Sequence, residues 1–206
     1  MITIIIIVVT AVISLLAFND PRFFGRLLFS PFMIINHRQG YRFVTHGFVH
    51  ADWVHLAVNM FVLFSFGKAV EHYYAVIFGL KASYFFILLY AGGILFSSVP
   101  SFAKHKDNQF YQAVGASGAV AAVVFAAILI NPLSPIRFVF IPVDIPAFIF
   151  GALYLGYSAY MAKKGNDNIG HDAHFWGALF GLVFTILLKP ALIGSFIRQI
   201  GNFIGA

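Results

Sequence analysis

Long apolar runs recur along the chain and leave little of the charged surface that a water-soluble domain needs. Only 10% of the 206 residues are charged, whereas ordinary soluble domains have about 25%. A membrane-spanning helix needs roughly 20 mostly apolar residues. Six runs approach that length, namely residues 2–18, 54–70, 82–99, 114–131, 145–161 and 173–188. The sequence therefore predicts an all-α, multi-pass membrane protein, with six transmembrane helices in a single domain over residues 1–206.

The length of the first connection and the charges of the loops between these runs indicate what the protein contacts. Residues 19–52 form a first connection of about 34 residues that contains prolines and aromatic residues, which favours a long first loop at the membrane interface. The net charge of +6 comes from basic residues scattered among the loops. This pattern suits anionic lipid headgroups and argues against nucleic-acid binding. Counted by alternate loops, the amino-terminal side of the membrane holds 5 basic residues and the opposite side 8. The positive-inside rule favours a non-cytoplasmic amino terminus by this small difference, which leaves both orientations open.

A serine among very small residues stands near the start of the fourth apolar run. Ser117 is preceded by Gly115 and followed by Gly118. Small residues let helices approach closely, so one interpretation is a packing seam. The other is chemical, because a helix N-terminus offers free backbone N–H groups to an anion and the flanking glycines admit a substrate backbone. The stretch is not the G-x-S-x-G elbow of soluble hydrolases, since Ala119 occupies the last position.

A histidine lies at the start of the sixth apolar run, on a face of small residues. Gly177 and Gly181 follow His174 by three and seven residues, so all three share one helix face. The Gly-x-x-x-Gly spacing permits another helix to approach that face closely. Such a histidine can be a capping or interfacial residue. It can also be the base that a serine nucleophile needs beside it.

More histidines precede and enter the second apolar run. His55 and Asn59 are four residues apart and share a helix face. Two hydrogen-bond donors that face one point suit a developing oxyanion, and a polar network between helices is the alternative. His46 and His50 have the same spacing and are candidate metal ligands. However, the H-E-x-x-H pattern of zinc proteases is absent, and Asp52 is the only carboxylate close to them in the sequence. Absence of cysteine excludes a cysteine nucleophile and a thiolate metal site.

In combination these residues resemble the rhomboid family of intramembrane serine proteases. The resemblance rests on Tyr41-Arg42, His46, His50, His55 and Asn59, then Gly115-Ala116-Ser117-Gly118, then Ala173-His174-x-x-Gly177-x-x-x-Gly181, and covers most of the chain. It implies a rhomboid-like bundle in which Ser117 is the nucleophile and His174 the general base. His55, Asn59 and the Ser117 backbone N–H would form the oxyanion hole. It also implies supporting roles for Gly115, Gly118, Gly177, Gly181, Arg42, His46, His50 and Glu71, the last as a hydrogen-bond acceptor that links helices.

The same resemblance sets the expected function and its partners. We expect an endopeptidase that cuts single-span transmembrane substrates near the membrane boundary through an acyl-enzyme, without a metal or other cofactor and without nucleic acid. The expected location is a bacterial inner membrane. A non-cleaving pseudoprotease that binds membrane clients is the alternative. One position departs from the family, because Ala121 stands where an aromatic residue usually packs against the histidine, four residues after the serine. Phe125 and Phe175 are candidates to replace that ring.

Overall fold

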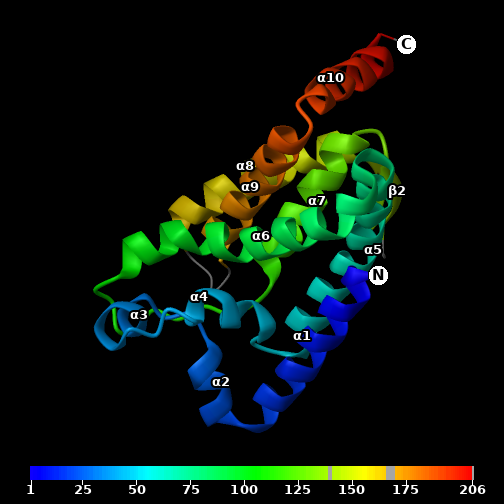
Figure 1. Ribbon diagram of the computed structural model, residues 1–206. Coiled ribbons are helices and arrows are strands. Elements are labelled where there is room, and N and C mark those ends of the chain that lie inside the picture. The colour runs from blue at the N-terminus through cyan, green and yellow to red at the C-terminus, as the bar shows by residue number, and fades with distance from the viewer. Residues whose placement is uncertain (139–140, 166–169, 206) are drawn as a thin grey trace.

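The chain folds into helices and one short hairpin. The computed structural model describes residues 1–138, 141–165 and 170–205 (Figure 1). The amino-terminal half contains α1 (Ile2–Asn19), α2 (Pro21–Leu27), α3 (Pro31–His37), α4 (Arg42–Thr45), the 3₁₀ turn η1 (His46–Phe48), α5 (Trp53–Phe78), the 3₁₀ turn η2 (Gly79–Lys81) and α6 (Ala82–His105). The remainder contains α7 (Ser117–Ile130), β1 (Pro135–Phe138), β2 (Ile141–Pro146), α8 (Ala147–Lys164), α9 (His171–Leu188) and α10 (Ala191–Ile204). The predicted helical class is confirmed.

Side-chain caps explain where the early helices begin. The Asp20 carboxylate accepts from two backbone N–H groups at the start of α2, and the Ser30 hydroxyl accepts from one at the start of α3. Both helices have proline in the first turn, where no N–H is needed. Asp52 accepts from the His55 N–H and starts α5. The first connection is therefore largely helical, and it folds back beneath α6 toward the start of α7 (Figure 1).

Helix α7 is the centre of the bundle. Every residue from Gly118 to Leu129 is buried, and α5, α6 and α9 all pack against this helix. Small residues permit the close approach, since a Cβ on Gly93 of α6 would lie 2.8 Å from Ala119 Cα, and a Cβ on Gly181 of α9 would lie 2.6 Å from Ala122 Cα. The first residue of α7, Ser117, is partly buried, and it opens the helix against which these three helices pack.

Two of the expected apolar runs begin later as helices than the sequence suggested. Residues 114–116 belong to a loop, because Gly115 has a φ of +112° and its N–H bonds to the His46 carbonyl. Ile145 and Pro146 belong to strand β2, which pairs antiparallel with β1 in a hairpin that the sequence analysis did not predict. An exposed ion pair between Arg137 and Asp144, 2.7 Å apart, joins the two strands.

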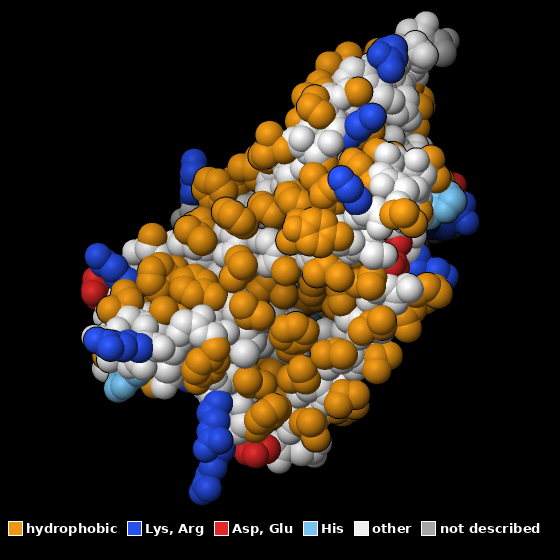
Figure 2. All heavy atoms as spheres, viewed as in Figure 1, with side chains coloured by type: hydrophobic (Ala, Val, Ile, Leu, Met, Phe, Trp, Pro, Cys, Tyr) orange, Lys and Arg blue, Asp and Glu red, His pale blue; other side chains and the backbone are white. Residues whose placement is uncertain are grey.

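Much of the surface is apolar, and several helices are candidates to span a membrane. In the part of the chain that the structure describes, three helical stretches are long and apolar enough to cross a membrane: Ile2–Asn19, Trp53–His105, which comprises α5, η2 and α6, and His171–Leu188. Helix α7 is apolar but shorter. Hydrophobic side chains cover most of the face shown in Figure 2, and lysines and arginines stand mainly at its rims. The expected six-span arrangement stays a prediction.

Candidate active site

Ser117 is the first residue of α7 and follows a tightly constrained loop. Gly115 is buried and has a φ of +112°, a conformation that residues with a Cβ rarely adopt. The His55 imidazole lies directly against it, since a Cβ on Gly115 would be 2.7 Å from His55 Cε1. Ala116 provides no side-chain cap. The first-turn N–H groups of α7, including that of Ser117, therefore have no acceptor within their own helix.

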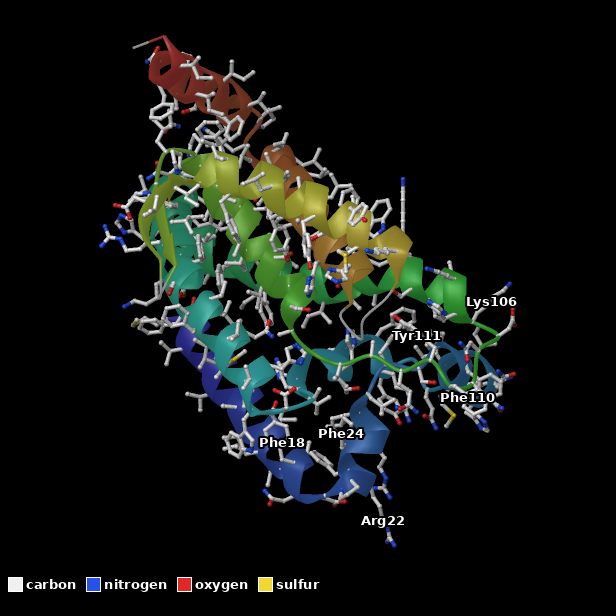
Figure 3. The ribbon with its side chains drawn as sticks, turned by 180° about the vertical axis from the view of Figure 1, so that it is seen from behind. Phe18, Arg22, Phe24, Lys106, Phe110 and Tyr111 are labelled. Atoms are coloured by element: carbon white, nitrogen blue, oxygen red, sulfur yellow. The ribbon has the colours of Figure 1, made fainter. Side chains whose placement is uncertain are left out.

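The loop before Ser117 is hydrogen-bonded to the first connection of the chain. Phe29 and Ala113 form an antiparallel bridge, with N···O distances of 2.9 and 3.1 Å. The Gly115 N–H donates to the His46 carbonyl at 3.0 Å, and the Ala116 N–H donates to His50 Nε2 at 3.4 Å. The position of the serine thus depends on residues far earlier in the sequence. Figure 3 shows this loop passing from Lys106, Phe110 and Tyr111 along the short helices to α7.

The hydrogen bonds of His50 fix its tautomer. The Ser14 hydroxyl donates to the Phe48 carbonyl at 2.9 Å, so its oxygen accepts from His50 Nδ1 at 3.0 Å. Nε2 is then unprotonated and accepts from the Ala116 N–H. Burial lowers the pKa of His50 to about 3, with His55 as a further cause, and lowers the pKa of His46 to about 4. Both rings are therefore neutral near pH 7.

Neither of these histidines lies in a metal site that the structure describes. His46 Nδ1 donates to the Arg42 carbonyl at 2.9 Å, and its ring packs on Phe29. Within residues 1–138, 141–165 and 170–205, no group of three or more His, Cys, Asp or Glu side chains is placed to hold a metal ion. His46 and His50 instead hold the first connection against the loop before Ser117.

His174 lies in the first turn of α9, and this turn packs on the first turn of α7. A Cβ on Gly118 would lie 3.3 Å from the Ala173 carbonyl oxygen. A Cβ on Gly177 would lie 2.7 and 2.8 Å from the carbonyl carbon and Cα of Gly118. The residues that neighbour Ser117 and His174 in the sequence are thus in backbone contact. Gly177 and Gly181 both lie on this contact face, as the Gly-x-x-x-Gly spacing predicted.

An aromatic ring from α8 stacks on His174. The Tyr154 and His174 rings have centroids 6.2 Å apart and planes inclined by 26°. Phe125 packs on Tyr154, and the centroids of the two rings are 5.6 Å apart. Phe175 packs edge-on against Trp176 at 5.5 Å. Ala121 itself is buried. Phe125 thus contacts Tyr154, and Tyr154 in turn contacts His174. The sequence analysis did not single out Tyr154.

The two expected oxyanion side chains lie on the face of α5 that meets α7. His55 is partly buried beside Gly115, and its ring packs edge-on against His50 with centroids 4.9 Å apart. Asn59 is buried one turn later. One N–H of the Asn59 amide donates to the His55 carbonyl at 2.9 Å, so the side chain is held against its own helix. The two residues share a face, as their spacing predicted.

Arg42 and Glu71 connect separate parts of the chain. Arg42 is buried, and its guanidinium donates to the Leu28 and Gly25 carbonyls at 2.6 and 2.9 Å and to Gln39 Oε1 at 2.6 Å. It therefore organises the first connection and does not reach the serine. Glu71 accepts from the backbone N–H groups of the first two residues of α1, at 2.6 and 3.2 Å. This carboxylate links α5 to the start of α1.

Comparison with known proteins places this arrangement in a family. A model of the Rhomboid domain matches residues 37–191. The chain is 31% identical over 184 residues to Rhomboid-like protein 11, chloroplastic, of Arabidopsis thaliana. The aligned region covers 82% of this chain and 60% of that protein. It is 29% identical to RHOMBOID-like protein 12, mitochondrial, of the same plant, over 66% of this chain and 42% of that protein. Against the human Presenilin-associated rhomboid-like protein, mitochondrial, the identity is 28% over 67% and 35% of the two chains.

These relatives are longer, and the chain spans between about a third and three fifths of their lengths. The matched region nevertheless contains both contact faces described above, from the histidines of the first connection to Gly181 of α9. It covers about three quarters of the residues printed here. On this extent of similarity, together with the helical membrane-type fold, the chain belongs to the rhomboid family.

Proposed function

We propose that this protein is an intramembrane serine endopeptidase with a dyad of Ser117 and His174. The observation that carries the proposal is the backbone contact between the two helix starts, where Gly177 packs on Gly118. Gly118 directly follows Ser117, and Gly177 lies one helical turn after His174. A serine hydroxyl is a weak nucleophile unless a base lies beside it. The glycine contact supports the proposed proximity of Ser117 and His174.

The reaction follows from the two groups. His174 takes the proton of the Ser117 hydroxyl as the oxygen attacks the carbonyl carbon of the scissile peptide bond. The tetrahedral intermediate collapses when the C–N bond breaks and the imidazolium gives its proton to the leaving amine. His174 then takes a proton from water, whose oxygen attacks the acyl-enzyme ester. Release of the new carboxyl product returns the proton to Ser117.

The environment of Ser117 supports stabilisation of the oxyanion. The Ser117 N–H belongs to the first turn of α7, at the positive end of the helix dipole. His55 lies against Gly115, two residues earlier. Asn59 lies one turn further along α5, and its amide nitrogen carries a second N–H besides the one bonded to His55 O. These three donors are the proposed oxyanion hole.

The dimensions of α7 suit a reaction that needs water inside a membrane. Its 14 residues extend about 21 Å, less than the roughly 30 Å of a bilayer core. In the proposed six-span arrangement, a helix this short ends below the membrane surface, where water can enter from one side. The proposed substrates are single-span transmembrane proteins, cut near the membrane boundary. The names of the relatives place those proteins in chloroplasts and mitochondria, which gives the expected bacterial inner membrane no support. The proposal is therefore for a multi-pass protein of a cell or organelle membrane.

Labelling by a serine-reactive fluorophosphonate and cleavage of a reconstituted single-span substrate test the proposal. Wild-type protein should label at Ser117 and cut the substrate, and Ser117→Ala and His174→Ala should do neither. Ser65→Ala is a matched control, because Ser65 is exposed on α5 and its hydroxyl bonds to its own helix. Equal cleavage by Ser117→Ala would refute the assignment. Folded wild-type protein that neither labels nor cuts, but retains a membrane client, would establish the non-cleaving alternative.

A further inference from the structure

Residue 121 is an alanine, although the rhomboid resemblance leads us to expect an aromatic residue there that packs against His174. A buried alanine there, one turn after Ser117, provides no ring to hold His174. The next residue on the same face of α7 is Phe125, whose ring packs on Tyr154. Ala121 therefore lies on the side of α7 that faces α8, between Ser117 and the Phe125–Tyr154 pair. The alanine side chain takes up little room beside the neighbouring helix.

Tyr154 reaches this place because α8 approaches α7 closely. A Cβ on Gly151 would lie 3.1 Å from Ile128 Cδ1 and 3.4 Å from Phe125 Cε1, so the absence of a side chain at residue 151 brings the helices together. Tyr154 is three residues later, on the same face. Its ring then stacks on His174, with an interplanar angle of 26° and centroids 6.2 Å apart. That separation lies within the range of favourable aromatic pairs.

The nearest carboxylate in the sequence does not orient the imidazole. Asp172 is two residues before His174, and a separation of two places side chains on different helix faces. Its carboxylate is 3.8 Å from the Lys104 ammonium group at the end of α6. The His171 ring meets the His174 ring edge-on, with centroids 6.0 Å apart. The Tyr154 ring from α8 is a second contact, and it can restrict rotation of the His174 side chain about χ1 and χ2. A general base needs such restriction, because proton transfer depends on a nitrogen held within hydrogen-bond reach.

We propose that Tyr154 is a positioning residue for His174, and that its ring, supplied from α8, replaces the one that an aromatic residue at position 121 would supply from α7. The inference rests on the proposed protease function and adds a residue to it. Tyr154 acts through the imidazole and has no covalent or proton-transfer role. The hydroxyl is therefore dispensable, and the aromatic face is what His174 requires.

The test compares four variants with the wild type in detergent or liposomes. Tyr154→Phe keeps the ring, and Tyr154→Leu removes it while it keeps most of the buried volume. Ala121→Tyr combined with Tyr154→Ala moves the ring from α8 to α7. Tyr160→Leu is the matched control, because this tyrosine is on the same helix, is exposed, and has its ring beside Lys164. The measurements are kcat and KM for the single-span substrate, fluorophosphonate labelling rate, melting temperature, and the NMR shift of the His174 ring protons.

The proposal predicts that Tyr154→Leu lowers kcat by about three- to tenfold with little change in KM, as expected for loss of one aromatic pair that holds the base. Tyr154→Phe and Tyr160→Leu should match the wild type. The double variant should recover at least half of the lost kcat. The His174 ring protons should lose their ring-current shift in Tyr154→Leu alone. A structural role without positioning would lower the melting temperature and leave kcat of the folded fraction unchanged.

Several outcomes would overturn the proposal. Wild-type kcat in Tyr154→Leu, or an unchanged His174 ring-current shift, would show that the stack does not hold the base. A loss in Tyr154→Phe equal to that in Tyr154→Leu would assign the effect to the hydroxyl instead. If the wild type itself neither labels nor cuts, the protease function fails and this inference falls with it, a result distinct from a loss confined to the Tyr154 variants.

Discussion

Gly177→Ala tests the contact that joins the two proposed catalytic residues. The new Cβ would lie 2.7 Å from the Gly118 carbonyl carbon and 2.8 Å from its Cα. Ordinary carbon–carbon contacts begin near about 3.5 Å, and the Gly118 carbonyl oxygen lies nearer still to the new Cβ, so α9 and α7 must separate there by at least roughly 0.8 Å. The obstructing atoms are backbone and cannot rotate away. His174 is one turn from Gly177 and moves with it.

A displacement of this size is expected to be costly for catalysis. Misplacement of a reacting group by about 1 Å can lower a rate by about 10²-fold, so we expect kcat to fall by one to two orders of magnitude. Overpacking of a well-packed contact costs about 1–3 kcal/mol of stability. Cleavage of the single-span substrate is therefore measured well below the melting temperature of the variant, so that only folded protein is compared.

Substitutions at two further glycines distinguish a loss of catalytic rate from a loss of stability. A Cβ on Gly181 would lie 2.6 Å from Ala122 Cα, but Gly181 is two turns from His174, so Gly181→Ala should lose similar stability and less of its kcat. Gly156→Ala adds a Cβ with nothing within 4 Å and should retain wild-type activity, with a gain of about 0.5–1 kcal/mol from helix propensity. Wild-type cleavage by well-folded Gly177→Ala would refute the argument that this contact sets the dyad.

Three other perturbations test the region before the serine. Gly115→Ala should slow fluorophosphonate labelling at least about tenfold, because φ of +112° strains an alanine and its Cβ would lie 2.7 Å from His55 Cε1; wild-type labelling would contradict this. Arg42→Lys should lower the free energy of unfolding by about 1.5–3 kcal/mol, because an ammonium group cannot reproduce three buried guanidinium bonds; an unchanged thermal unfolding curve would count against it. The lowered pKa values of His46 and His50, about 4 and 3, mean that the unfolded chain takes up protons near pH 6.5 that the folded protein does not. Thermal unfolding should therefore show stability that is constant above pH 6.5 and declines as pH falls toward 4, by up to about 1.4 kcal/mol per pH unit for each histidine, and that decline should be shallower in His50→Gln.

The sequence predicted those features that depend on spacing along one helix. Apolar runs predicted helices, and the separation of Gly177 from Gly181 predicted a face in close contact with another helix. His55 and Asn59 share a face of α5 for the same reason. In each case the relevant geometry is the 3.6-residue period, which is a local property that tertiary packing changes little. Residue types and spacing were sufficient here.

Features that depend on distant contacts could not be predicted in this way. Residues 114–116 are as apolar as the helix that follows, yet the N–H groups of Gly115 and Ala116 bond to residues from the first connection, and these bonds replace a further helical turn. Tyr154 lies in an apolar run with several other aromatic residues. Nothing in its spacing distinguishes it, because its contact with His174 is set by how α8 packs on α7.

Helix α1 also has a consequence for the site, although it lies outside the matched Rhomboid region, residues 37–191. Ser14 of α1 is fully buried, and its hydroxyl fixes Nδ1 of His50 as the protonated nitrogen. Only that tautomer leaves Nε2 able to accept from the Ala116 N–H, immediately before Ser117. Two hydrogen bonds thus connect α1 to the residue that precedes the proposed nucleophile. The next backbone N–H is that of Ser117, the first residue of α7, and it is the donor assigned to the proposed oxyanion hole.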